Sequence, residues 1–140
     1  MNGPHRASWV RAAIVAGIVY FIIGRGSAEI DPFVPDPARF PWRVTSWVLS
    51  AALFVSHIKY ERRRLGSTPR ELALHTSAAV ALGGFLLAVA AMAHAFIVEP
   101  HASHALFLLA LFLWPAITAL PAFVVALVAG TLFDRRTRKT

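Results

Sequence analysis

Residues 59–71, with the sequence KYERRRLGSTPRE, decide the fold of this chain. They separate two long apolar runs and hold five basic residues and a glycine, Gly66, of the kind that ends helices. Thr68 and Glu71 have the spacing of a capping box, and Pro69 stands at the first position of the next helix. The stretch therefore predicts a short connection between two antiparallel helices.

The composition predicts a membrane protein. Hydrophobic residues make up 57% of the 140 residues and charged residues 15%, whereas soluble domains hold about 45–50% and about 25%. The net charge is +7, but the basic residues gather at the ends of apolar runs, where anionic lipid headgroups attract them. We therefore expect lipid headgroups and no nucleic acid as partners. Because the chain has no cysteine, disulfides, thiolate nucleophiles and cysteine-ligated metals are excluded.

Four apolar runs predict an all-α fold, a transmembrane four-helix bundle that forms a single membrane domain. The predicted spans cover about residues 9–24, 42–60, 72–98 and 103–133. The first is shorter than the ~20 residues of a full crossing, so Arg11 has to extend to the headgroups. A secretory signal that ends near residues 26–28 is the alternative interpretation. In the last run, Pro115 and Pro121 predict a kink or a local unwinding.

The distribution of basic residues predicts the orientation. Two lie before or within the first turn of the first span, five lie in residues 59–71, and four lie in the tail 134–140, which accounts for eleven of the fourteen. The positive-inside rule then places both termini in the cytoplasm of a multi-pass inner-membrane protein. Residues 29–41 contain four prolines, which predict an extended loop on the outer side.

His57 and His75 are the first candidate site. They stand at similar distances from the 59–71 connection, so at ~1.5 Å per residue their depths differ by about 3 Å. Two imidazoles at one depth on adjacent helices could ligate a haem or a chlorin magnesium, or relay protons. The alternative is a structural role with hydrogen bonds to neighbouring groups. No Asp or Glu is predicted deep in any span, which disfavours a proton-coupled pump.

A second group of candidate ligands lies near the predicted outer end of the third span. Histidines three residues apart on a first helical turn can share a divalent metal ion. The group consists of His94, Glu99, His101 and His104. The alternative is a solvated turn whose charge follows the pH.

A face of small residues along the third span predicts close helix packing. Small side chains let another backbone approach, which is what drives helix association in lipid. The seam consists of Ser77, Ala81, Gly84, Ala88, Ala91 and Ala95. Ala13 and Gly17 of the first span are its candidate partner.

These patterns predict a non-catalytic accessory or assembly subunit of a larger membrane complex, formed with other subunits or by self-association. One alternative is a haem- or chlorin-binding electron-transfer or light-harvesting subunit that uses His57 and His75. Another is an oligomeric channel lined by the second span and the proline-containing fourth span. An enzyme is the least expected class, because the sequence has none of the common hydrolase motifs.

Overall fold

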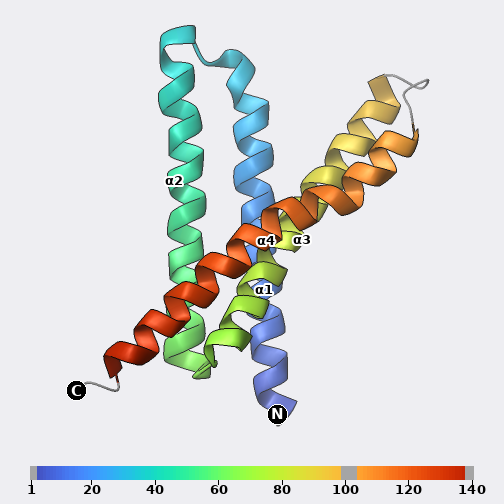
Figure 1. Cartoon of the computed structure of the whole chain (residues 1–140). Helices are drawn as coiled ribbons and strands as arrows, with labels where there is room; N and C mark the ends of the chain where they lie inside the picture. The colour runs from blue at the N-terminus through green and yellow to red at the C-terminus, as the bar shows by residue number, and fades with distance from the viewer. Residues whose placement is uncertain (1–2, 99–103, 138–140) are drawn as a thin grey trace.

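The computed structural model describes residues 3–98 and 104–137, and the side chains of residues 8–98 and 106–135. These residues are almost entirely helical, and no strand occurs among them, so the predicted all-α fold is confirmed (Figure 1). The long helices are α1 (Gly3–Ile30), α2 (Asp36–Tyr60), α3 (Pro69–Val98) and α4 (His104–Thr137). A 3-10 turn, η1 (Asp31–Phe33), follows α1, and a π-helical turn, η2 (Glu61–Leu65), follows α2.

The connection between α2 and α3 has the predicted structure. Gly66 ends the helical path with a φ of 61°, a left-handed conformation that glycine adopts without strain. The capping box forms in both directions: the Thr68 amide donates to Glu71 Oε2 at 2.9 Å, and the Glu71 amide donates to Thr68 Oγ1 at 3.3 Å. Three residues, 66–68, therefore suffice to reverse the chain.

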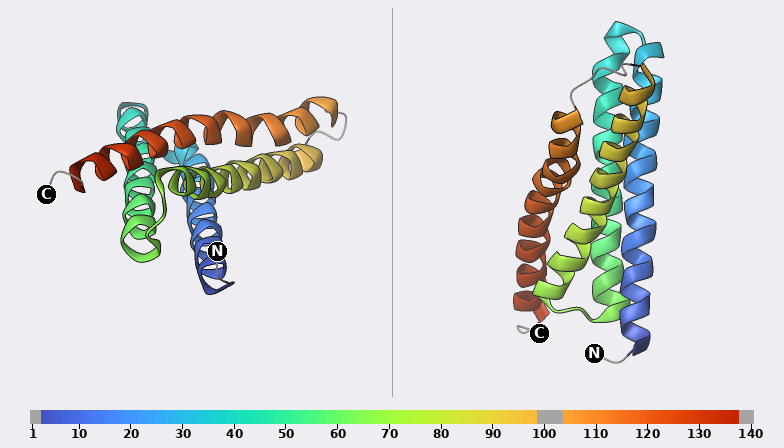
Figure 2. Two further views of the ribbon diagram at one scale, coloured as in Figure 1. Left: turned by 60° about the horizontal axis from the view of Figure 1, so that its bottom comes forward. Right: turned by 90° about the vertical axis from the view of Figure 1, so that its right-hand side faces the viewer.

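The four helices form two hairpins that cross. α1 with α2 makes one pair and α3 with α4 makes the other, as the two turned views show (Figure 2). α3 packs on α4 and on α1, whereas α2 and α3 are neighbours only beside their connection and then diverge. The prediction that α2 and α3 are antiparallel neighbours therefore holds only at that end, because small residues draw α3 onto α1 instead.

The contact between α1 and α3 is unusually close. A Cβ atom added to Gly83 would lie 2.6 Å from Tyr20 Cβ and 3.1 Å from the Gly17 carbonyl oxygen. One turn away, buried Ala13 and Ala79 pack together. Only glycine and alanine permit this backbone separation, so these positions fix where the two hairpins cross.

The predicted seam of α3 lies mostly toward α4. An added Cβ on Gly84 would lie 2.8 Å from Thr118 Oγ1, and Ala88 and Ala91 line a cavity together with Trp114. The α1 patch of Ala13 and Gly17 does contact α3, but through Ala79 and Leu82 rather than through the seam. The seam of α3 and the α1 patch were predicted to pack on each other. Instead the seam faces α4, and the α1 patch packs on a different face of α3.

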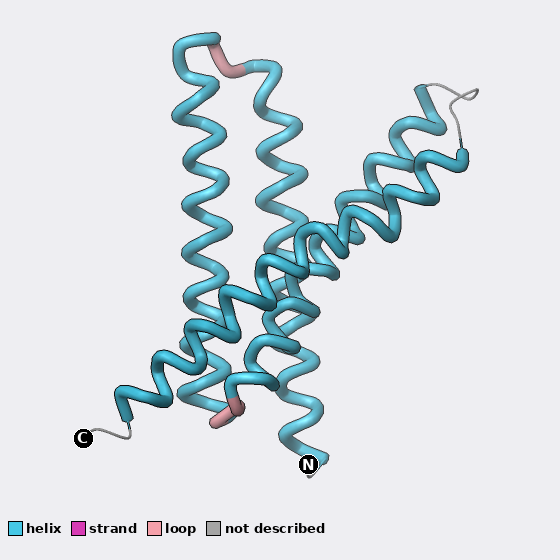
Figure 3. Tube along the Cα trace, in the orientation of Figure 1, coloured by secondary structure: helices cyan, strands magenta, loops and turns pink. Residues whose placement is uncertain are grey.

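The prediction of an extended proline-rich loop over 29–41 is wrong. Figure 3 shows that only a short piece of chain, residues 34–35, separates η1 from α2. Pro37 is compatible with a helix because it stands in the first turn of α2, where no amide donor is needed. Pro41 lies within the same helix. The α1–α2 end is held by Ser27 Oγ and Ser46 Oγ, 2.7 Å apart.

Three of the described helices are long and apolar enough to cross a membrane. The candidate spans are Ser8–Phe33, Pro69–Val98 and Leu106–Arg135. α2 is not among them, so a fourth crossing and the orientation of the termini stay predictions. The predicted unwinding of α4 is wrong, because the helix continues through Pro115 and Pro121.

Candidate functional site: a buried carboxylate between two histidines

His57 and His75 both face one carboxylate, that of Glu61. His75 Nδ1 lies 3.0 Å from Glu61 Oε2, and His57 Nε2 lies 3.6 Å from Glu61 Oε1. His57 occupies the last turn of α2 and Glu61 follows it by four residues, so the two stand on one helical face. The exposed fractions are 5% for His57, 9% for His75 and 0% for Glu61.

The surroundings of Glu61 stabilise its ionised form. Burial raises the pKa of this carboxyl, but His57, His75 and a hydrogen bond from Ser67 Oγ to Oε2 at 2.7 Å together outweigh burial. The net result is a pKa below the usual glutamate range. Glu61 is therefore a buried negative charge that three side chains contact, one from α2, one from α3 and one from their connection.

α1 closes the site through Trp9. The indole ring stacks on the imidazole of His75, with 4.2 Å between ring centroids and 2° between planes. Thr76 follows His75 on α3 and is fully buried. The carboxylate cluster, formed by His57, Glu61, Ser67 and His75, therefore joins the first hairpin to the second at the end where the α2–α3 connection lies.

Several buried polar atoms have no hydrogen-bond partner among the described residues. The set comprises Trp9 Nε1, Tyr20 Oη, both ring nitrogens of His57, Glu61 Oε1 and Thr76 Oγ1. Buried polar atoms are normally paired, because an unpaired one loses its hydration without compensation. Apart from Tyr20, all of these atoms belong to the carboxylate cluster, to Trp9, which stacks on His75, or to Thr76, which follows His75 in the sequence.

Arg62 fixes the π-helical turn against α4. Its Nη2 lies 2.5 Å from Asp134 Oδ1, its Nη1 donates to the Gly130 carbonyl at 3.2 Å, and its guanidinium lies 5.7 Å from the centre of the Phe133 ring. These contacts join a cation to a carboxylate and to an aromatic face. They hold the residue next to Glu61 in place, and so position the carboxylate.

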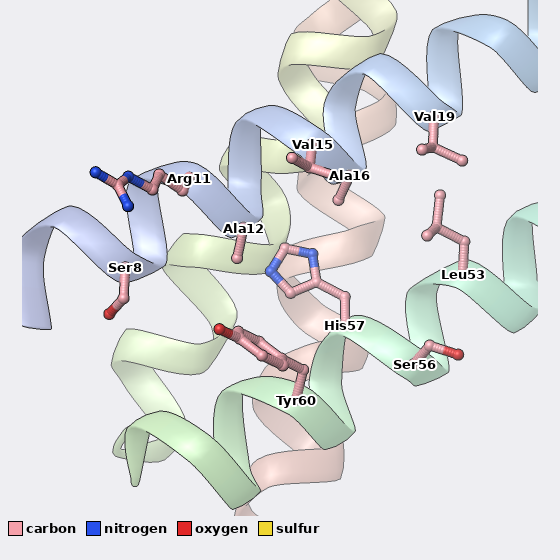
Figure 4. A pocket seen from close by; sticks show the side chains of 10 residues that line it. All are labelled: Ser8, Arg11, Ala12, Val15, Ala16, Val19, Leu53, Ser56, His57 and Tyr60. Atoms are coloured by element: carbon pink, nitrogen blue, oxygen red, sulfur yellow. The ribbon is translucent and has the colours of Figure 1, made fainter.

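A groove opens beside the cluster, between α1 and α2. Its volume is about 570 Å³, within the range of ~300–1,000 Å³ of small-molecule sites. Figure 4 shows the imidazole of His57 pointing from α2 toward α1, between Ala12 and Ala16. His57 thus contacts the carboxylate cluster and the groove at once.

No known protein family, curated protein or solved structure matches this chain. Within the described residues, no group of three His, Asp or Glu side chains is arranged to hold a metal ion. Of the predicted outer ligands, His94 is exposed on α3, Glu99 and His101 lie outside the described residues, and the side chain of His104 is not described.

The sequence predicted that His57 and His75 lie at one depth, but Glu61, the carboxylate between them, was not predicted as part of the site. Glu61 stands beside Lys59 and Arg62, and this charged run predicts a solvated helix end. The available signal was the four-residue spacing from His57, which places an acid and an imidazole on one helical face. Its burial depends on α1 and α3, which no local pattern specifies.

Proposed function

We propose that this chain is a non-catalytic accessory or assembly subunit of a larger membrane complex. The observation that carries the proposal is the incomplete packing of α2. Among the described residues, this helix packs along α1 and meets α3 and α4 mainly around Phe54 and Ile58, near its C-terminal end. Its Trp47 and Val48 are 80% and 60% exposed, so apolar surface of this helix is left for another helix.

A groove between the two hairpins supports this proposal. It has a volume of about 850 Å³, and all four helices contribute to its walls. Tyr20, Trp47 and Trp114 supply aromatic surface, and Gly83 and Gly84 supply places of close backbone approach. In lipid, helices associate through such shape-matched packing rather than through hydrophobicity itself. We propose that a transmembrane helix of a partner subunit enters this groove.

The polar residues of α2 favour a packing role over conduction. Thr45 Oγ1 donates to the Pro41 carbonyl, Ser46 Oγ to Trp42 and Ser56 Oγ to Ala52, each within its own helix. Hydroxyls that are paired to their own backbone do not form a continuous line of donors for an ion or water path. A channel is therefore the weaker proposal.

We expect Ala122→Phe to release the chain from its complex, because the added ring fills the groove between the hairpins. Ala122 lines that groove on α4, whereas Ala116 lies exposed on the same helix. Ala116→Phe is therefore the matched control and should leave the complex intact. The measurement is the mass of the tagged protein, extracted in native lipid discs from the cells that produce it. A wild-type protein that is monomeric, or an Ala122→Phe protein of unchanged mass, would refute the proposal.

Cofactor binding by His57 and His75 is a separate prediction with its own measurement. Axial ligation needs two imidazoles on opposite faces of a macrocycle, whereas both rings here face the Glu61 carboxylate. We therefore expect the purified protein to show no Soret or chlorin absorption band. A band that disappears in a His75→Ala variant would instead establish the light-harvesting or electron-transfer alternative.

A further inference from the structure

We infer that the groove between α1 and α2 binds an anionic phospholipid of the bilayer. The headgroup lies at the end marked by Arg11 and Tyr60, and an acyl chain extends along the apolar part toward Val19 and Leu53. This groove is separate from the groove between the hairpins, and it shares no lining residue with it. The inference therefore goes beyond the proposed assembly role and does not depend on it.

The polar and apolar lining residues of the groove occupy different ends. Ser8, Arg11 and Tyr60 stand at one end, near the start of α1 and the last residue of α2. Figure 4 shows the Tyr60 hydroxyl directed toward the Ser8 and Ala12 region of α1. Farther along, the polar lining residues are His57 and Ser56, whose hydroxyl donates to its own helix, and the lining toward Val19 and Leu53 is apolar. A groove that is polar at one end and apolar at the other matches an amphiphile.

His57 is the second observation that points to a ligand. It is 5% exposed, it lines the groove, and neither of its ring nitrogens has a hydrogen-bond partner among the described residues. A neutral imidazole keeps one N–H donor and gains a second on protonation. Nε2 lies 3.6 Å from Glu61 Oε1, whereas Nδ1 has no acceptor among the described residues. A phosphate or phosphodiester oxygen in the groove would supply that acceptor.

The charges of the groove favour an anionic headgroup over a zwitterionic one. Arg11 lines the groove, and no Asp or Glu stands among its ten lining residues. Guanidinium groups bind phosphate oxygens through paired, charge-assisted hydrogen bonds. The predicted orientation also places Arg11 at the headgroup level of the cytoplasmic leaflet, where anionic lipids concentrate. A lipid is therefore the occupant whose two ends match the two ends of the groove.

The test is lipid binding to the full chain, measured by native mass spectrometry in detergent. Phosphatidylglycerol, phosphatidylcholine and palmitate are titrated separately. We expect phosphatidylglycerol to bind about tenfold more tightly than phosphatidylcholine, because the choline cation would lie near Arg11 with no lining carboxylate to pair with it. Arg11→Gln should remove this preference, and Ala12→Phe should block binding of both phospholipids by filling the groove. Arg64→Gln removes the same charge from an exposed site outside the groove and should change affinity less than about twofold.

Each contrary result has a distinct meaning. Equal affinity for the two phospholipids, or an unchanged preference in Arg11→Gln, overturns the assignment of an anionic headgroup. Displacement of phosphatidylglycerol by equimolar palmitate overturns the assignment of a bilayer phospholipid. Unchanged lipid binding by a folded Ala12→Phe protein shows that the groove is not the site. A polypeptide found in the groove in place of lipid overturns the assignment of a lipid occupant. Thermal unfolding of each variant verifies its fold, and Val15→Trp, at a second lining position, replaces Ala12→Phe if that variant does not fold.

Discussion

Replacing Glu61 with alanine is expected to lower the free energy of unfolding by about 3 kcal/mol, the usual cost of removing one partner from a buried charged network. The loss is large because three side chains, His57, His75 and Ser67, face this carboxylate and would be left without it. The measurement is reversible unfolding in mixed micelles. Glu29→Ala is the matched control, since its ion pair with Arg25 lies on an exposed helix face and such pairs contribute little. Equal losses in the two variants would contradict a special role for the buried carboxylate.

The same carboxylate predicts the acid limb of the stability curve. Because the pKa of Glu61 is lower in the folded protein than in the unfolded chain, its ionisation stabilises the fold above the unfolded value of about 4.3. That contribution falls away as the pH drops from there through the lower, folded pKa. We therefore expect Glu61→Gln to flatten the decline in stability below about pH 4.3. An identical acid limb in both proteins would show that other groups cause the decline.

Gly83→Ala is the second substitution with a large expected effect. The new methyl group would lie 2.6 Å from Tyr20 Cβ and 3.1 Å from a backbone oxygen of α1, so the two helices have to separate. Overpacking of this kind costs about 1–3 kcal/mol, and Gly83→Leu should cost more. The measurement is again unfolding in mixed micelles, with crosslinking between α1 and α3 as a second readout.

Gly26→Ala provides the matched control for that substitution. An added Cβ at Gly26 has no neighbouring heavy atom within 4 Å, and alanine is the better helix former by about 1 kcal/mol. We therefore expect Gly26→Ala to be neutral or slightly stabilising. If Gly83→Ala proved equally harmless, the crossing of the hairpins would not depend on this contact.

The parts of the fold that sequence could predict are those fixed by nearby residues. Gly66, Thr68 and Glu71 specify the α2–α3 connection through bonds that span only a few positions. The proline-rich stretch was predicted to be extended because its prolines were counted without regard to helix position. Pro37 instead stands in a first turn, where its missing amide donor costs nothing.

The face that each helix presents could not be predicted in the same way. Ala81, Ala88 and Gly83 are all small residues of α3. The sequence does not indicate which of these small residues another helix packs against. The selection depends on Tyr20 and Leu82 fitting around the contact, which only the assembled structure shows. The burial of Glu61 could not be predicted for the same reason. It depends on the packing of α1 and α3 around the carboxylate, which the residues near Glu61 do not specify.

The crossing of the two hairpins has a consequence for how the protein fits bilayers of different thickness. α3 has 30 residues, so at ~1.5 Å per residue it is about 45 Å long, while the hydrocarbon layer is ~30 Å thick. Helices longer than this layer fit by tilting. The close contacts between α1 and α3 run from Trp9 against His75 to Gly24 against Leu87, so the two helices are held together at several levels. A thicker or thinner bilayer is therefore expected to change the tilt of both hairpins together rather than the angle between them.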